Sequence, residues 1–246
     1  MTYVHLGRRG LAVACALLVG AGVLVTAAAP AARATAGPIT GSYANAAGSL
    51  AYELYVPDSY QAGTAVPLVV ALHGCTETAD QFRRLSGFDD LAAAKGFIVV
   101  YPEQSRSNNW LGCWDWFNAQ QVTRGASEPS LIAGITAWVQ QNYSIDSHRI
   151  YVTGLSAGGA MAAVMAATYP DLYAAVAVGS GCEYTAGAAC AGWRSDDPEL
   201  AGRRAYQAMG SYARPVPFMV FHGDQDQIVP PANAQQSVRA WQVADD

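Results

Sequence analysis

The sequence predicts an α/β fold with a mostly parallel sheet and helices on both faces. Short apolar runs alternate along the chain with helical stretches, and such runs are typical of strands buried on both sides. One run, residues 149–153, leads into Gly154-Leu155-Ser156-Ala157-Gly158 and a small-residue helix over Ala160–Thr168. This G-x-S-x-G pattern between a strand and a helix is typical of a nucleophile elbow in an α/β enzyme.

The first half of the domain contains three predicted strands and one helix. Residues 35–48 are rich in Gly, Ala and Thr and are predicted to be a loose start. Ser49–Val56 is rich in Tyr and Leu and resembles a strand, and Val66–Leu72 is a continuous apolar run typical of a buried strand. The sequence then predicts a helix over Phe82–Lys95 and a buried strand over Phe97–Tyr101.

The second half repeats this alternation with longer loops. Pro102–Ser127 is polar and aromatic without a useful period, so we expect a loop over the active face. Pro129–Asn142 places its apolar residues on one helical face, with Pro129 in the first turn. The elements predicted after the elbow helix are a strand, an irregular excursion, a strand and a helix: Tyr173–Gly179, Cys182–Tyr212, Val216–Phe221 and Ala232–Ala244.

The N-terminus has the features of a secretory signal. Arg8-Arg9 precedes an apolar run over Leu11–Ala29, and small-residue cleavage motifs end at Ala34 and Ala36. A membrane anchor is the less favoured alternative, because the run is rich in Ala and Gly and ends in these motifs. We therefore expect a signal peptide over 1–34, a catalytic domain over 35–246, and a secreted protein with no stable membrane anchor. The sequence does not distinguish export by the Sec pathway from export by the twin-arginine pathway.

Charge excludes one class of partner. The chain has 14 Lys and Arg against 19 Asp and Glu, a net charge of −5. Removal of residues 1–34 takes three arginines and no acids, which leaves 11 basic and 19 acidic residues and a net charge of −8. No cluster of Lys or Arg remains, so a nucleic-acid binder is not expected. The length without residues 1–34 fits one domain. We also expect a monomer.

Four cysteines follow the predicted signal: Cys75, Cys113, Cys182 and Cys190. In an exported chain an even number indicates two disulfides, and four cysteines allow three connectivities among which these spacings do not choose. None has zinc-finger spacing, and no cluster of His, Cys and Asp indicates a metal site.

Ser156 is the predicted nucleophile. A serine between a strand and a helix takes strained backbone angles, and flanking glycines allow the two elements to approach. The helix start directs free N–H groups, first that of Ala157, toward a developing oxyanion. The alternative is a simple Gly/Ser turn, which the strand before Ser156 and the helix after it disfavour.

The other parts of the site come from two further strand ends. A second oxyanion donor is expected from the loop after Val66–Leu72, as the N–H of Cys75 or Thr76, with His73 ordering that loop by hydrogen bonds. Asp226 is preferred over Asp224 as the orienting carboxylate, because Asp224 directly follows a glycine and can cap the turn.

Four motifs together resemble a known family. They are Leu72–Ala79 (LHGCTETA), Asn108–Phe117, Gly154–Met161 and His222–Asp226. In this order they are similar to the esterase/polyhydroxybutyrate depolymerase family, which is related to feruloyl and acetylxylan esterases. The resemblance implies an α/β-hydrolase fold, secreted ester hydrolysis without a cofactor, and Ser156 and Asp226 as triad members. It also implies a Cys75–Cys113 bridge, which leaves Cys182 to pair with Cys190.

The chain departs from the family pattern at the base. The family's catalytic histidine lies near the C-terminus beyond the carboxylate, but the histidines here, His5, His73, His148 and His222, all precede Asp226. We therefore expect the sequence to stop before the last strand, the base and the closing helix.

Trp110, Trp114 and Trp116, together with Phe117, are the predicted substrate-contacting aromatics, because exposed rings suit an aryl ester, a sugar or a polyester chain. The alternative is a loop pinned by a disulfide with its tryptophans packed inward. The predicted function is a secreted serine carboxylic-ester hydrolase acting on polymeric or polymer-linked esters, first of all a poly(3-hydroxybutyrate) depolymerase-like esterase. The alternatives are a feruloyl or acetylxylan esterase and, from another class, a non-catalytic ester- or glycan-binding remnant.

Overall fold

The computed structural model describes residues 37–192 and 197–246. The predicted signal peptide, residues 1–34, lies outside the described residues. No helix within the two described ranges is long and apolar enough to span a membrane.

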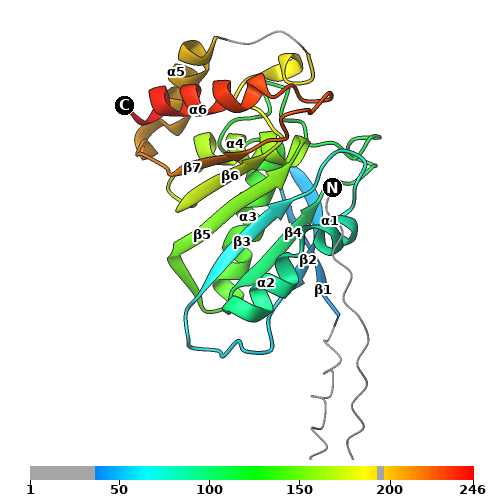
Figure 1. The fold of residues 1–246 in the computed structure, drawn as a ribbon. Helices are drawn as coiled ribbons and strands as arrows, with labels where there is room; N and C mark the ends of the chain where they lie inside the picture. The colour runs from blue at the N-terminus through cyan, green and yellow to red at the C-terminus, as the bar shows by residue number, and fades with distance from the viewer. Residues whose placement is uncertain (1–36, 193–196) are drawn as a thin grey trace, which may run out of the picture. The chain divides into compact units, whose positions relative to one another are not determined.

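The described residues form a seven-stranded sheet in the order β1-β2-β4-β3-β5-β6-β7 (Figure 1). In chain order the strands are β1 (Ile39–Asn45), β2 (Gly48–Tyr55), β3 (Val66–Leu72), β4 (Ile98–Glu103), β5 (Ile145–Leu155), β6 (Ala175–Gly179) and β7 (Phe218–Phe221). The β1/β2 and β2/β4 pairs are antiparallel, and the other four pairs are parallel. The predicted mostly parallel sheet is confirmed, and its parallel strands end at one edge.

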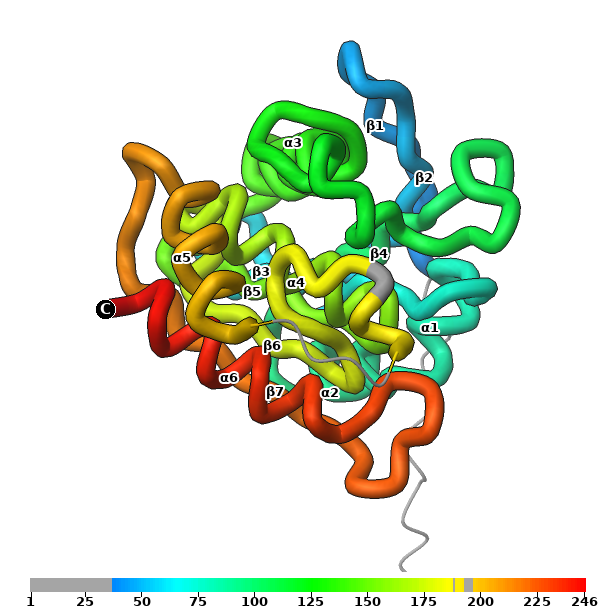
Figure 2. The backbone as a smooth tube through the Cα atoms, turned by 90° about the horizontal axis from the view of Figure 1, so that it is seen from above, coloured from blue at the N-terminus to red at the C-terminus, as the bar shows by residue number. Residues whose placement is uncertain are grey.

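Helices cover both faces of this sheet. They are α1 (Ala79–Ser86), α2 (Phe88–Lys95), α3 (Ser127–Asn142), α4 (Ala157–Thr168), α5 (Pro198–Met209) and α6 (Ala232–Asp245). Alternate residues of β3 separate the two layers: Leu68, Val70 and Leu72 join a cluster with α3 and α4, whereas Ala71 joins a smaller cluster with α1 and α2. Figures 1 and 2 show α5 and α6 side by side, with α6 next to β7.

Three predicted elements differ from the structure. Residues 39–45 form strand β1 instead of a loose start; the strand is mostly exposed and therefore lacks an apolar signal, and its pairing with β2 defines it. The predicted helix Phe82–Lys95 is two helices, because Gly87 adopts the left-handed conformation with φ 69°. The predicted irregular excursion Cys182–Tyr212 contains α5, which begins with an Asp197 cap and Pro198.

Candidate active site

Ser156 lies at the sharp turn between β5 and α4. Its backbone angles are φ 56° and ψ −120°, which a residue other than glycine rarely adopts. A Cβ on Gly158 would clash with the carbonyl oxygens of Leu72 and His73 at the end of β3. A Cβ on Gly154 would clash with the carbonyl of Gly158. The two glycines therefore let helix α4 start directly against the strand ends, as the elbow requires.

The start of α4 is anchored to the neighbouring strand. The N–H of Ser156 donates to the carbonyl of Gly179 at the end of β6, at 2.8 Å. Ala157 is the first residue of α4, and the amides of a first helical turn have no partner within the helix. Its N–H is therefore available to an oxyanion beside Ser156, where the partial positive charge of the helix start adds to the attraction.

The loop after β3 contributes one candidate donor instead of two. The N–H of Thr76 donates to the carbonyl of Leu111 at 3.0 Å, so this amide already has a partner. The N–H of Cys75 has no hydrogen-bond partner among the residues that the structure describes. Glu77 holds the loop from the other side, because its Oε2 accepts the N–H of Gly74 at 2.8 Å. Cys75 is therefore the remaining candidate from this loop.

His73 is a structural residue. Its side chain is fully buried, Gln104 donates its backbone N–H to Nε2 at 3.0 Å, and Nδ1–H donates to the carbonyl of Gly74 at 2.7 Å. Nε2 accepts a hydrogen bond, so the proton is on Nδ1 and the ring is neutral. Burial lowers the pKa of His73 below its usual value. His73 orders the loop and has no free nitrogen with which to act as a base.

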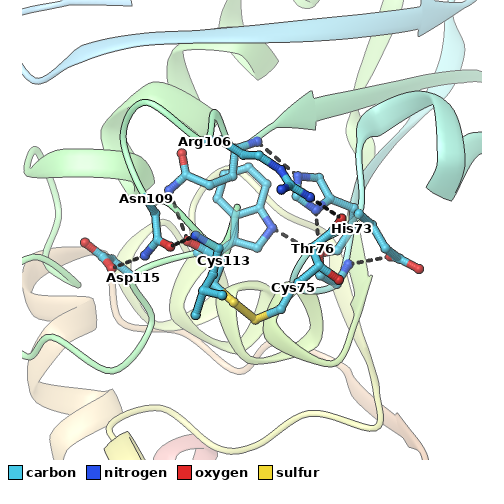
Figure 3. The surroundings of a disulfide bond; sticks show 12 residues. His73, Cys75, Thr76, Arg106, Asn109, Cys113 and Asp115 are labelled. Atoms are coloured by element: carbon cyan, nitrogen blue, oxygen red, sulfur yellow. Dashed lines mark hydrogen bonds between the residues drawn. A yellow bond between two sulfur atoms is a disulfide. The ribbon is translucent and has the colours of Figure 1, made fainter.

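Two disulfides stabilise the loops around Ser156. Cys75 is bonded to Cys113, with their Cα atoms 4.3 Å apart, and Cys182 is bonded to Cys190, with their Cα atoms 5.7 Å apart. This is the pairing that the family resemblance implies. Figure 3 shows the first bridge joining the loop after β3 to the aromatic loop (residues 104–126). Both loops therefore keep one relative position beside the nucleophile.

The three predicted substrate-contacting tryptophans have different environments. Trp114 is fully buried and its Nε1–H donates to the carbonyl of His73 at 3.0 Å, as in the alternative in which the tryptophans pack inward. Trp116 is partly buried against a small cluster that contains Cys182, Cys190 and Val229. Trp110 is 77% exposed. Of the three rings, that of Trp110 is the most accessible to a ligand, and Phe117, 50% exposed, is the other open ring of the loop.

Asp226 lies in the loop after β7. Its Oδ1 accepts the N–H groups of Ile228 and Val229, both at 2.9 Å. The Ser180 hydroxyl also donates to this carboxylate. These bonds, that of Val229 first, lower the pKa of Asp226, so the group is a carboxylate at neutral pH. Ser180 follows β6, and its N–H donates to the carbonyl of Phe221 at the end of β7, at 2.8 Å.

The other histidines of the described part are not placed as a base for Ser156. His222 Nε2 is 2.8 Å from the carbonyl of Val229 and 3.6 Å from Oδ2 of Asp226. Its Nδ1 is buried without a hydrogen-bond partner among the described residues, so it is closed to a substrate. His148 is exposed near the start of β5, eight residues before Ser156, a distance of about 26 Å along an extended strand.

Sequence reasoning missed three residues that support the site: Ser180, Gln104 and Glu128. The only sequence signal for Ser180 is its place in Gly179-Ser180-Gly181, a run of small residues after a buried strand. Gln104 and Glu128 are polar residues with 2% and 5% exposure. Burial raises the pKa of Glu128 to about 8. Within the described ranges, no group of three or more His, Cys, Asp or Glu side chains is placed to hold a metal ion.

Comparisons with known proteins agree on one family. The family model described as Esterase PHB depolymerase matches residues 50–243. The chain is 39% identical over 202 residues to poly(3-hydroxyalkanoate) depolymerase C of Paucimonas lemoignei, covering 79% of this chain and 48% of that protein. It is 34% identical over 226 residues to acetylxylan esterase A of Talaromyces purpureogenus, covering 85% and 58%. The solved acetyl xylan esterase from Aspergillus awamori matches with a TM-score of 0.72 and 31% identity, covering 79% of this chain and 74% of that one. The chain spans about half the length of these two curated relatives.

Proposed function

This chain belongs to the esterase PHB depolymerase family, and on that premise we propose that it is the catalytic domain of a secreted serine carboxylic-ester hydrolase. The observation that carries the proposal is the strained elbow that places Ser156 between β5 and the start of α4. In the proposed reaction the Ser156 Oγ attacks the ester carbonyl, and the N–H groups of Ala157 and Cys75 stabilise the resulting oxyanion. Asp226 orients the base that takes the serine proton. The histidines of the described part are not placed to be this base, which the proposal leaves unassigned.

The proposed substrate is a polyester of the poly(3-hydroxybutyrate) type. A relative named as a poly(3-hydroxyalkanoate) depolymerase, 39% identical, supports this choice. The exposed rings of Trp110 and Phe117 offer apolar area to an insoluble chain. Acetylated xylan is the second candidate, because relatives and a solved structure of more than 30% identity are named as acetylxylan esterases. Feruloylated polysaccharide is the remaining predicted alternative.

Two features support an extracellular location. The sequence predicts a signal peptide over 1–34, and two disulfides hold the loops around the site. Disulfides persist in oxidising compartments and are rare in the cytosol. We therefore propose that the enzyme acts outside the cell on a polymer that does not enter it.

The test compares substrates at natural length. We expect soluble products from poly(3-hydroxybutyrate) granules, slower acetate release from acetylated xylan, and none of either from Ser156→Ala. If only acetate is released, the substrate is acetylated xylan. If only ferulate is released, the substrate is a feruloylated polysaccharide. Binding to a polymer without hydrolysis of any ester, including p-nitrophenyl butyrate, would overturn the enzyme proposal in favour of a binding protein.

A matched pair of variants tests the aromatic surface. Trp110→Ala is expected to retain hydrolysis of soluble p-nitrophenyl butyrate and to release fewer products from granules, since its exposed ring supports no core packing. Leu85→Ala is a control, because Leu85 is similarly exposed at 76% on α1. Equal granule activity in both variants would contradict the role proposed for Trp110.

A further inference from the structure

Gln104, directly after β4, joins three segments behind the site. Its backbone N–H donates to Nε2 of His73 at 3.0 Å. Its side-chain amide donates to the carbonyl of Cys113 at 3.2 Å and also to Oε1 of Glu128. The end of β3, the aromatic loop and helix α3 are thus connected through one buried residue, by its backbone N–H and its side-chain amide. Such a fully bonded polar group fixes its partners, because leaving any of them unpaired in the interior is costly.

Glu128 lies in the first turn of α3 with both carboxylate oxygens in use. Oε1 accepts from Gln104, and Oε2 accepts the backbone N–H of Asp115 at 2.7 Å. Both partners are donors, so this arrangement suits an ionised carboxylate. A protonated Glu128 has a hydroxyl that must donate. Gln104 can accept from it only by turning its amide oxygen toward Glu128, and the bond to the Cys113 carbonyl is then lost.

The consequence reaches the candidate oxyanion donor through short connections. Cys113 is covalently bonded to Cys75, whose N–H is the proposed donor. Trp114, the next residue, donates to the carbonyl of His73 just before that loop. Figure 3 shows the bridge between Cys75 and Cys113 with His73 nearby. A displacement of the segment 113–115 therefore moves the loop that contains Cys75.

We propose that Glu128 is a positioning residue: its ionised form holds the Cys75 loop in the working position, and its protonated form loosens that loop. The inference rests on the proposed esterase function. Burial, which raises the pKa of Glu128 to about 8, places the change between mildly acidic and mildly alkaline conditions. The charged or titratable groups around this network, among the described residues, are Asp115 and Arg106 in the aromatic loop, His73 at the end of β3, and Glu77 and Glu103 beside His73.

The test is the pH dependence of turnover at natural length. In the wild type, kcat on p-nitrophenyl butyrate should rise about two- to tenfold as the pH increases through a midpoint near 8, with little change in KM. The size of the rise is the factor that corresponds to the free energy of about one hydrogen bond. Glu128→Gln, which has one acceptor oxygen and one donor nitrogen at this position, should remain at the low-pH level. Glu199→Gln is the matched control, because Glu199 pairs with Arg239 on the exposed side of α5, and it should keep the wild-type profile.

A second variant keeps the test decisive if Glu128→Gln does not fold. Asp115→Asn removes a neighbouring negative charge that raises the pKa of Glu128, so the midpoint should move to lower pH. Near-UV circular dichroism of the buried Trp114 should follow the same midpoint without any turnover. The inference would be overturned if the wild type is active and the Glu128→Gln variant still shows the alkaline rise in kcat. It would also be overturned if the pH midpoint does not shift in Asp115→Asn. A wild type that is inactive on every ester would overturn the proposed function instead.

Discussion

Removal of the Cys75–Cys113 bridge should destabilise the domain more than removal of the second bridge. The first bridge closes a loop with a sequence separation of 38, and the second closes one of 8. The loop-entropy relation gives about 4 kcal/mol for the longer loop and about 2.5 kcal/mol for the shorter one. The double variant Cys75→Ala/Cys113→Ala should therefore lose about 1.5 kcal/mol more unfolding free energy than Cys182→Ala/Cys190→Ala.

Urea unfolding followed by tryptophan fluorescence measures both losses, with the wild type as reference. The first double variant should also lose esterase turnover below the urea transition, because the Cys75 N–H is no longer held beside Ser156. A Cys182/Cys190 variant that is the less stable of the two would contradict the predicted order. Wild-type turnover in the Cys75/Cys113 variant would refute the positioning role of the bridge.

Three further predictions follow from the site and its charges. Gly158→Ala should reduce turnover at least about tenfold and lower the unfolding temperature, because its Cβ would clash with the Leu72 and His73 carbonyls; an unchanged melting curve would contradict this. In the folded state the Glu128 carboxyl keeps its proton up to about pH 8, because burial raises its pKa. In the unfolded state it loses that proton above its ordinary pKa of 4.5. Stability should therefore fall by about 2–3 kcal/mol between pH 6 and pH 9, and urea titrations of Glu128→Gln should lack this slope. The 246-residue chain by itself should show at most trace hydrolysis of p-nitrophenyl butyrate, because His73, His148 and His222 are not placed as a base; activity abolished by substituting one of them would identify it as the base.

The sequence was sufficient where a local pattern determines the structure. The parallel strands β3, β4, β5 and β6 are apolar runs with clear ends, and these runs were located to within a few residues. The elbow at Ser156 could be predicted because glycine has the only side chain small enough at Gly154 and Gly158. The ordering role of His73 followed from its place directly after a buried strand, and the structure shows both of its ring nitrogens hydrogen-bonded.

Tertiary contacts decided the features that the sequence did not predict. Strand β1 is mostly exposed, so only its pairing with β2 distinguishes it from a loop. Trp114 and Trp110 lie in the same aromatic segment, and the sequence does not distinguish them. The Trp114 ring is buried and donates to the carbonyl of His73, whereas the Trp110 ring is exposed. The amide of Thr76 is taken by Leu111, a partner 35 positions away that spacing alone does not identify.

The most direct test of the account is covalent labelling of the nucleophile. The natural-length protein is treated with a fluorophosphonate, digested, and analysed by mass spectrometry. We expect a single adduct on Ser156, formed at a rate that falls when Asp226 is replaced by Asn, and no adduct in Ser156→Ala. An adduct on another serine, or wild-type labelling and ester turnover in Ser156→Ala, would contradict the assignment of the elbow as the catalytic centre.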